Sequence, residues 1–236
     1  MICHKSLHFL FSIMINNPFS LFQPFHEKII VNFFSKSDGI SDRETLVKQL
    51  DTDNLLALKQ VHGARVIAVN SASWKKIEAD AVFTDLKGLN LAVSFADCQN
   101  LVIYEPEKKV IGVVHAGWRG IVAGVVNEAI DLIVREWDIA PADLYVGAGP
   151  ALCLDCSDFS DPGNEVPALK NFIKGKKVDL RSALESQLWE KGVSKDRFER
   201  LSGCTRCEPE KYWTYRGGDR EAVKGGYTNV MTLKLQ

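Results

Sequence analysis

Residues 110–120, Val-Ile-Gly-Val-Val-His-Ala-Gly-Trp-Arg-Gly, carry the pattern that decides the fold of this 236-residue chain. The apolar run at residues 110–115 is short enough for a buried β-strand, and it ends at His115. Gly117 then permits an unusual backbone turn. Apolar residues at helical spacing follow: Val122, Val126, Ile130, Ile133 and Trp137. A buried strand that leads into an amphipathic helix is typical of an α/β fold.

The same organisation extends on both sides of this stretch. Further strands are predicted at residues 28–36, 55–61, 65–69, 79–84, 89–95, 100–104, 143–148, 197–202, 212–216 and 230–235, and further helices at residues 43–50 and 179–191. Asp161-Pro162-Gly163 is a loop that does not divide the chain. We therefore predict one α/β domain, with a large mixed sheet and helices packed outside it.

The N-terminal residues contain an apolar run that does not fit the strand and helix pattern of the rest of the chain. An apolar run at residues 7–15 follows Lys5, but it is shorter than the roughly 20 residues of a membrane span. No small-residue cleavage site follows it, as a signal peptide would require. Met14 is a second candidate start. We predict a loosely ordered extension at residues 1–25, a catalytic domain at residues 26–236, and a cytoplasmic location.

The composition narrows the class of partner. The chain is 46% hydrophobic and 25% charged, with a formal net charge of −1, so it lacks the basic balance of a nucleic-acid-binding protein. We expect a small-molecule partner, neither nucleic acid nor membrane, and a monomer is compatible with the sequence. A chain of this length can bury enough core to fold without disulfides. Its six cysteines therefore favour metal binding or catalysis by reduced thiols.

Three metal-capable residues each follow a predicted strand: His62, Cys98 and His115. Two imidazoles and one thiolate suit zinc with a fourth position open, where the pKa of bound water falls to about 7. Copper is the alternative metal for the same donors. Without a metal, Cys98 would instead be the nucleophile of a cysteine hydrolase, with a histidine as its base.

Four of the five remaining cysteines, all except Cys3, form two Cys-x-x-Cys pairs, Cys153 with Cys156 and Cys204 with Cys207. Such pairs often hold a structural zinc ion. The 47 residues between them exceed the spacing of a compact zinc ribbon, although a larger fold could bring them together. Disulfides or inert buried thiols are the competing interpretations.

Several strings resemble the YfiH-like family, once called laccase-domain or multicopper polyphenol oxidase proteins. They are Lys59-Gln60-Val61-His62-Gly63, Ala79-Asp80-Ala81, Ala96-Asp97-Cys98, His115-Ala116-Gly117-Trp118-Arg119-Gly120 and Gly147-Ala148-Gly149-Pro150. The resemblance runs from about residue 28 to the C-terminus. It implies an α/β/β/α sandwich and zinc held by His62, Cys98 and His115. It also implies phosphorolysis of adenosine, inosine, guanosine or methylthioadenosine, with inorganic phosphate as co-substrate, and deamination of adenosine.

Three neighbours of the metal residues are candidates for substrate chemistry. Asp97 would move protons or orient a ligand, or else cap the next turn. Arg119 would hold phosphate at the helix start, or else form a structural salt bridge. Gln60 would contact substrate or face solvent. We therefore take Asp97 and Arg119 as candidate catalytic residues, and Gln60 and Arg119 as candidate substrate-binding residues.

The chain departs from the family pattern where arginines are expected. Residues 35–41 contain none, and Lys224-Gly225-Gly226 stands in place of Thr-Gly-Arg. Ser157-Asp158-Phe159 also replaces the usual tyrosine after Cys156. Such arginines would grip phosphate or ribose. Besides the nucleoside enzyme and the cysteine hydrolase, we therefore keep two alternatives: a laccase-like copper oxidase and a catalytically weakened binding protein.

Overall fold

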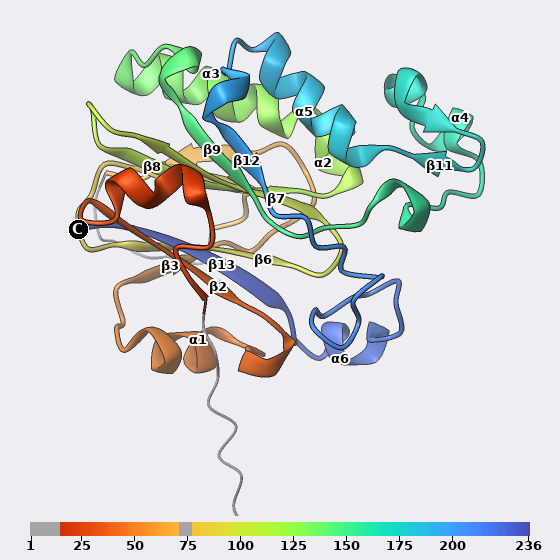
Figure 1. Ribbon diagram of the computed structural model, residues 1–236, viewed down its shortest axis with the longest axis horizontal. Coiled ribbons are helices and arrows are strands. Elements are labelled where there is room, and N and C mark those ends of the chain that lie inside the picture. Colours follow the sequence, from red (N-terminus) through yellow and green to blue (C-terminus); the bar gives the residue numbers. More distant parts are fainter. Residues whose placement is uncertain (1–14, 71–76) are drawn as a thin grey trace, which may run out of the picture.

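The computed structural model describes residues 15–70 and 77–236, which form four layers in the order helix, sheet, sheet, helix (Figure 1). The first sheet has the strand order β1 (Ile15–Asn16), β2 (Ile29–Phe34), β13 (Asn229–Leu235), β6 (Asn90–Phe95) and β3 (Leu55–Ala57). Strand β3 runs parallel to β6, and the other pairs are antiparallel.

The second sheet has the order β12 (Phe198–Arg200), β9 (Tyr145–Ala148), β7 (Gln99–Glu105), β8 (Val110–Ala116), β5 (Ala81–Thr84) and β4 (Val66–Ala68). It is also mixed, because β12 pairs with β9 and β4 with β5 in parallel. The predicted α/β class with mixed sheets is confirmed. The single large sheet expected from strand patterns is in fact two, as the family resemblance implied.

Helices cover the outer face of each sheet (Figure 1). Helix α1 (Arg43–Leu50) lies on the first sheet, and α2 (Trp118–Val122), α3 (Val125–Trp137) and α5 (Leu180–Glu190) lie on the second. The smaller elements are α4 (Pro162–Glu165), the hairpin β10 (Ile173–Lys174) and β11 (Lys177–Val178), α6 (Arg220–Lys224), and the 3-10 helices η1 (Ser20–Phe25), η2 (Lys36–Asp38), η3 (Pro141–Asp143), η4 (Leu154–Cys156), η5 (Pro167–Phe172) and η6 (Lys195–Arg197).

Three apolar clusters fill the interfaces between the four layers. Phe33 and Val93 meet Val102 and Val113 between the sheets. The helical stripe of α3 and α5 packs on the second sheet, and Leu46 belongs to the cluster between α1 and the first sheet. Because strands inside this sandwich are covered on both faces, they appear in the sequence as continuous apolar runs.

Two predicted elements are wrong in detail. The apolar stripe beginning at Val122 spans two helices, because Gly124 adopts a left-handed φ of 81° and α3 begins after it. Residues 212–216 are not a strand. Thr214 donates its hydroxyl to Asp97, and its backbone N–H bonds to the Asp219 side chain, so this segment forms turns. The sequence patterns also did not indicate β1 or α6.

The predicted looseness of residues 1–25 does not extend to residues 15–25. Strand β1 pairs with β2, and Phe19 and Phe22 are buried among the aromatic residues of the intersheet core. Residues 1–14, which hold most of the apolar run and Met14, lie outside the described residues. Among the described residues, no helix has the length and apolarity needed to cross a membrane. The boundary at residue 26 stays a prediction.

Candidate metal centre

Asp80 fixes the backbone at His62. One carboxylate oxygen, Oδ1, accepts the N–H of His62 at 2.8 Å, and Oδ2 accepts the N–H of Gly63 at 2.7 Å. His62 has a φ of 59°, a left-handed conformation that is uncommon outside glycine. Such strained residues gather at functional sites, where surrounding contacts hold them. The two hydrogen bonds to Asp80 supply those contacts here.

The same carboxylate orients the ring of His115 at the end of β8. Nδ1 of His115 lies 2.9 Å from Oδ1 of Asp80, and both side chains are almost fully buried. Because Nδ1 is engaged with the carboxylate, Nε2 is left for a metal. The rings of His62 and His115 stand nearly perpendicular, with centroids 4.6 Å apart. This arrangement of carboxylate, histidine and open ring nitrogen is typical of zinc sites.

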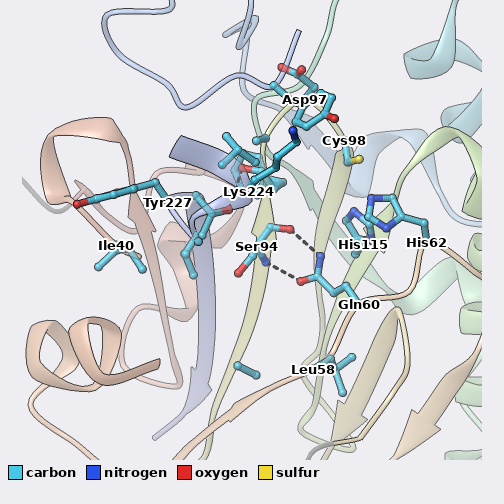
Figure 2. A pocket seen from close by; sticks show the side chains of 18 of the residues that line it. Ile40, Leu58, Gln60, His62, Ser94, Asp97, Cys98, His115, Lys224 and Tyr227 are labelled. Atoms are coloured by element: carbon cyan, nitrogen blue, oxygen red, sulfur yellow. Dashed lines mark hydrogen bonds between the residues drawn. The ribbon is translucent and has the colours of Figure 1, made fainter. Parts of the chain in front are cut away.

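Cys98 completes the group from the turn between β6 and β7. One ligand atom each from His62, Cys98 and His115 lies within 4.8 Å of the other two, and Figure 2 shows these side chains on one wall of a pocket. Gly117 keeps the space beside them clear, because a Cβ there would lie 3.0 Å from His62 Cδ2 and 3.1 Å from Cys98 Sγ. Two imidazoles and one thiolate at this spacing fit a zinc ion.

The electrostatics of the group favour an ionised thiol. Burial raises the pKa of Cys98, but hydrogen bonds and charge from His115 and His62 outweigh it and lower the pKa from 9.0 to about 6. Burial lowers the pKa of His115, whereas Asp80 and Cys98 raise it, to about 9. Burial also raises the pKa of Asp80, yet its bonds from His115 and the backbone of Gly63 hold it below its ordinary value. The thiolate that a metal requires is therefore available at neutral pH.

A pocket of about 980 Å³ opens in front of the three metal residues. This is at the upper end of the range for small-molecule sites. Its far walls come from α1, the β6 end and residues 215–230, with Tyr215 and Tyr227 partly exposed within it. His62 is exposed, so the ligand group faces this pocket rather than the core.

Gln60 and Asp97 line the pocket, but their polar groups are engaged elsewhere. The amide of Gln60 donates to the carbonyl of Ser94 and accepts its N–H, as a β-bridge partner would (Figure 2). Asp97 accepts the hydroxyls of Thr205 and Thr214 on Oδ1 and the N–H of Arg216 on Oδ2. Their predicted substrate and proton-transfer roles stay predictions, and the geometry adds a structural role for each.

Arg119 also lines the pocket, at the second position of α2. Its guanidinium lies 4.0 Å from the ring centroid of Trp118, and it has no hydrogen bond or ion pair to any described residue. The alternative of a structural salt bridge therefore has no partner within the described chain. Trp118 packs edge-on against Phe159, which agrees with a packing role.

Asp80 lies in one of the strings that resemble the family, but no local pattern specifies its role. A carboxylate directly before a buried strand was the available signal, since a buried charge needs partners. The pocket residues Tyr215, Tyr227, Arg43 and Lys224 were also missed. They come from α1 and the C-terminal segment, far along the chain from the metal residues, and no local pattern connects them.

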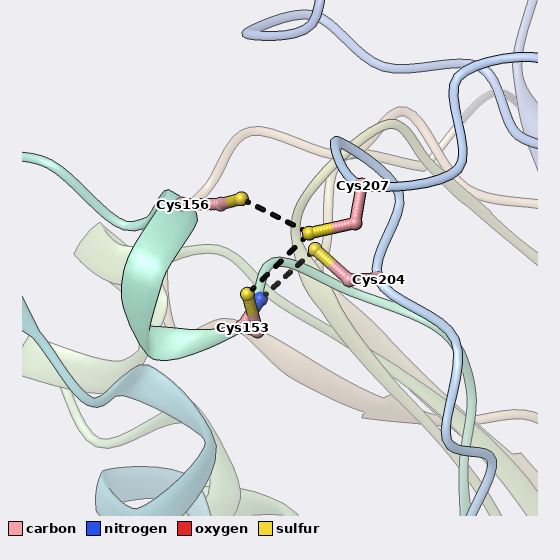
Figure 3. Close-up of side chains that lie close together, drawn as sticks. All are labelled: Cys153, Cys156, Cys204 and Cys207. Atoms are coloured by element: carbon pink, nitrogen blue, oxygen red, sulfur yellow. Dashed lines mark hydrogen bonds between the residues drawn. The ribbon is translucent and has the colours of Figure 1, made fainter.

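The second set of thiols also comes together. The Sγ atoms of Cys153, Cys156, Cys204 and Cys207 all lie within 4.8 Å of one another (Figure 3). The long interval between the two pairs is bridged because parallel pairing of β12 with β9 ends both segments at the same edge of the sheet.

The fold places the chain in a known class of α/β sandwich proteins. The crystal structure of YlmD from Geobacillus stearothermophilus has a TM-score of 0.78 at 22% identity and covers 94% of this chain and 96% of that chain. The crystal structure of Bacillus licheniformis YfiH has a TM-score of 0.77 at 22% identity, covering 88% and 93%. These likenesses establish the fold.

Sequence comparison establishes the family. The model of the multi-copper polyphenol oxidoreductase laccase family matches residues 36–234, so the chain belongs to that family and the predicted resemblance is confirmed. Purine nucleoside phosphorylase YlmD of Geobacillus stearothermophilus is 27% identical over 203 residues, covering 77% of this chain and 74% of the relative. Adenosine deaminase RL5, from an unknown prokaryotic organism, is 29% identical over 210 residues, covering 79% and 78%.

Proposed function

We propose that this protein is a zinc-dependent enzyme acting on purine nucleosides. Its reactions would be phosphorolysis of adenosine, inosine, guanosine or methylthioadenosine, and deamination of adenosine. The observation that carries the proposal is the convergence of His62, Cys98 and His115 on a pocket large enough to hold a nucleoside. Relatives named as a purine nucleoside phosphorylase and an adenosine deaminase support the substrate class.

Zinc suits this donor set better than a copper cluster does. The three residues offer one thiolate and two imidazoles, which make one site for one ion. A multicopper centre needs further histidines, and none of the described residues adds one to this group. Bound zinc would act as a Lewis acid and would activate water at neutral pH.

The protein residues would position the substrate. Tyr215 and Tyr227 present partly exposed rings to the pocket, and aromatic faces stack on purine bases. Asp80 would hold His115 in one tautomer and keep His62 in its left-handed conformation. Asp80 would not contact the substrate, since its side chain is fully buried. The ribose would then lie between the tyrosines and the metal residues.

Arg119 would bind the phosphate co-substrate. Its exposed guanidinium is free of hydrogen bonds to described residues, and stacking on Trp118 limits the positions it adopts. A planar guanidinium can bind two phosphate oxygens at once. Lys224 and Arg43 also line this pocket, where Lys224 pairs with Glu221 and Arg43 donates to the carbonyls of Asp53 and Leu55.

One observation favours a second candidate, a cysteine hydrolase. Cys98 lies beside two histidines, and its lowered pKa of about 6 would give a nucleophilic thiolate without a metal. In that case His115 would serve as the base. The two candidates use the same atoms and differ in whether a metal holds them.

The deciding experiment supplies zinc-loaded protein with adenosine, with and without phosphate, and separates the products by chromatography. Inosine without phosphate would demonstrate deamination, and adenine with ribose 1-phosphate only when phosphate is present would demonstrate phosphorolysis. The His115→Ala variant should abolish both. Absence of all products from fully zinc-loaded protein would favour a binding protein. Activity that survives metal removal but not alkylation of Cys98 would favour the hydrolase.

A further inference from the structure

Four cysteines outside the pocket gather their sulfur atoms at one point (Figure 3). After β9, Cys153 directly precedes η4 and Cys156 is its last residue, and Cys204 and Cys207 lie in a turn after β12. The Sγ of Cys207 lies 3.4 Å from that of Cys156 and 3.9 Å from that of Cys153. We call these four residues the cysteine quartet.

The spacing of the quartet matches a metal site. Four thiolates around zinc at about 2.3 Å place neighbouring sulfurs about 3.8 Å apart, whereas a disulfide bond is about 2.05 Å long. All four sulfurs lie within 4.8 Å of one another, and even Cys156 and Cys207, at 3.4 Å, are well beyond the length of a disulfide bond. Inert core thiols are also a poor description, because Cys207 is exposed and Cys153 is half-buried.

Polar contacts around the quartet suit thiolate ligands. The backbone N–H of Cys153 points at the Sγ of Cys204, at 3.3 Å. Such N–H bonds to ligand atoms stabilise negative charge on sulfur and orient the ligands. Arg206 lies between Cys204 and Cys207 in the sequence, and its guanidinium donates to the carbonyl of Cys156. The same guanidinium pairs with Asp158 at 2.7 Å, which fixes its position beside the cluster.

The quartet joins two segments that are otherwise held mainly by hydrogen bonds, including those that Arg181 donates to the carbonyls of Ala151, Leu152 and Gly203. The local apolar cluster contains only Leu152, Cys156 and Cys204, with Cys153 at its margin. Burial of so few apolar atoms stabilises a contact weakly. A metal ion would replace the missing core, as it does in small domains that lack one.

The segment after Cys204 also forms part of the pocket. Thr205, the next residue, donates its hydroxyl to Asp97 at 2.7 Å, and Asp97 directly precedes the metal residue Cys98. Tyr215 and Arg216 of the same segment line the pocket. The quartet therefore helps to fix the position of the segment that carries Tyr215 and Arg216 on the pocket wall.

We propose that Cys153, Cys156, Cys204 and Cys207 bind a second, structural zinc ion, in a tetrahedral site made entirely of thiolates. The ion clamps residues 204–216 against residues 151–156 and holds this wall of the pocket in place. The proposal does not depend on the nucleoside activity, because it concerns different ligands with a separate stoichiometry.

The test is the zinc content of the full-length protein and three variants, purified under reducing conditions and measured by mass spectrometry of the metal. We expect two zinc ions per chain in the unmodified protein. The His62→Ala/His115→Ala variant should keep one, and Cys153→Ser/Cys207→Ser, at the two more accessible cysteines, should lose one. Asp155→Asn is the matched control and should keep two, since this exposed carboxylate lies between Cys153 and Cys156 and bonds only to Lys177.

Cobalt substitution of the His62→Ala/His115→Ala variant gives an independent measurement. The remaining ion should show the intense thiolate-to-cobalt absorption of a four-sulfur site. This result supports the proposal even if the double serine variant does not fold. A single zinc ion that disappears in the histidine variant would overturn it, as would a Cys156–Cys207 disulfide in non-reduced peptide maps. Two zinc ions with no nucleoside product would overturn the proposed function and leave this inference standing.

Discussion

Oδ1 of Asp80 accepts a hydrogen bond from the backbone of His62 and lies 2.9 Å from Nδ1 of His115. One oxygen thus positions two candidate metal ligands that are far apart in the sequence. The bond to His115 selects the ring nitrogen that faces the pocket, and the bond to His62 maintains a left-handed backbone. The carboxylate is therefore the element that organises the site.

We predict that Asp80→Asn weakens zinc binding at this site by about 10–100-fold, because the amide cannot accept from every donor that the carboxylate serves. Competition with a coloured chelator would measure the affinity. Glu78→Gln is the matched control, since this nearby carboxylate pairs only with Lys59 at the surface. Equal affinity in the two variants would show that Asp80 does not organise the site.

Gly117→Ala should also impair the site. The new Cβ would approach His62 Cδ2 and Cys98 Sγ to 3.0 and 3.1 Å, so the ligands themselves must move. Overpacking of this kind costs about 1–3 kcal/mol, or about 5–150-fold in zinc affinity if the cost falls on the bound state. Titration with zinc would measure it. Gly163→Ala should be neutral, because its Cβ would meet Asp161 at an ordinary 3.6 Å.

Metal-free protein should show an unusually acidic thiol at Cys98. Because its pKa is about 6 rather than 9.0, alkylation should keep its full rate from neutral pH down to about pH 6 and fall about tenfold per unit below that. Peptide mass spectrometry would follow Cys98 separately from the other thiols. Zinc should protect it, because the thiolate would then be a ligand. A midpoint near pH 9 would contradict the described pairing with His115.

Arg119→Ala should raise the KM for phosphate in phosphorolysis by about 10–100-fold, the loss expected for hydrogen bonds to a charged group. Deamination of adenosine should change little, because it uses no phosphate. Steady-state kinetics of both reactions would separate the effects. Arg135→Ala removes an exposed arginine that pairs only with Glu136 and should leave both unchanged. A parallel loss of both activities would exclude a phosphate-specific role.

Asp97→Asn should reduce the free energy of unfolding by about 1–3 kcal/mol, because the neutral amide has one acceptor oxygen where the carboxylate uses two, for the hydroxyls of Thr205 and Thr214 and for the N–H of Arg216. Denaturant unfolding would measure this against Asp131→Asn, a change at an exposed surface ion pair. The form of the rate–pH profile should be retained. If stability is unchanged and the rate no longer falls on one side of the pH optimum, Asp97 transfers protons, and its hydrogen bonds to residues 205–216 are secondary.

Much of the secondary structure could be predicted from the sequence. Helix α1 has the predicted bounds, and strands β5 to β8 fall within about two residues of the predicted runs. These elements are buried on one or both faces, so their apolar periodicity is strong. The failures lie where side-chain hydrogen bonds replace a backbone ladder, as at Thr214, or where one glycine turns the chain, as at Gly124.

The sequence by itself determined the α/β class, the family and the donor types, because apolar periodicity and the string around His115 are local properties. The strand patterns alone indicated one sheet, and the family resemblance already implied two; only the tertiary structure decided that Asp80 serves both histidines. It also decided that Gln60 and Asp97 are engaged with the backbone and with loop hydroxyls, and that two distant Cys-x-x-Cys pairs meet. These are contacts between residues far apart in the chain, and they depend on strand pairing across the sheets, which no local pattern specifies.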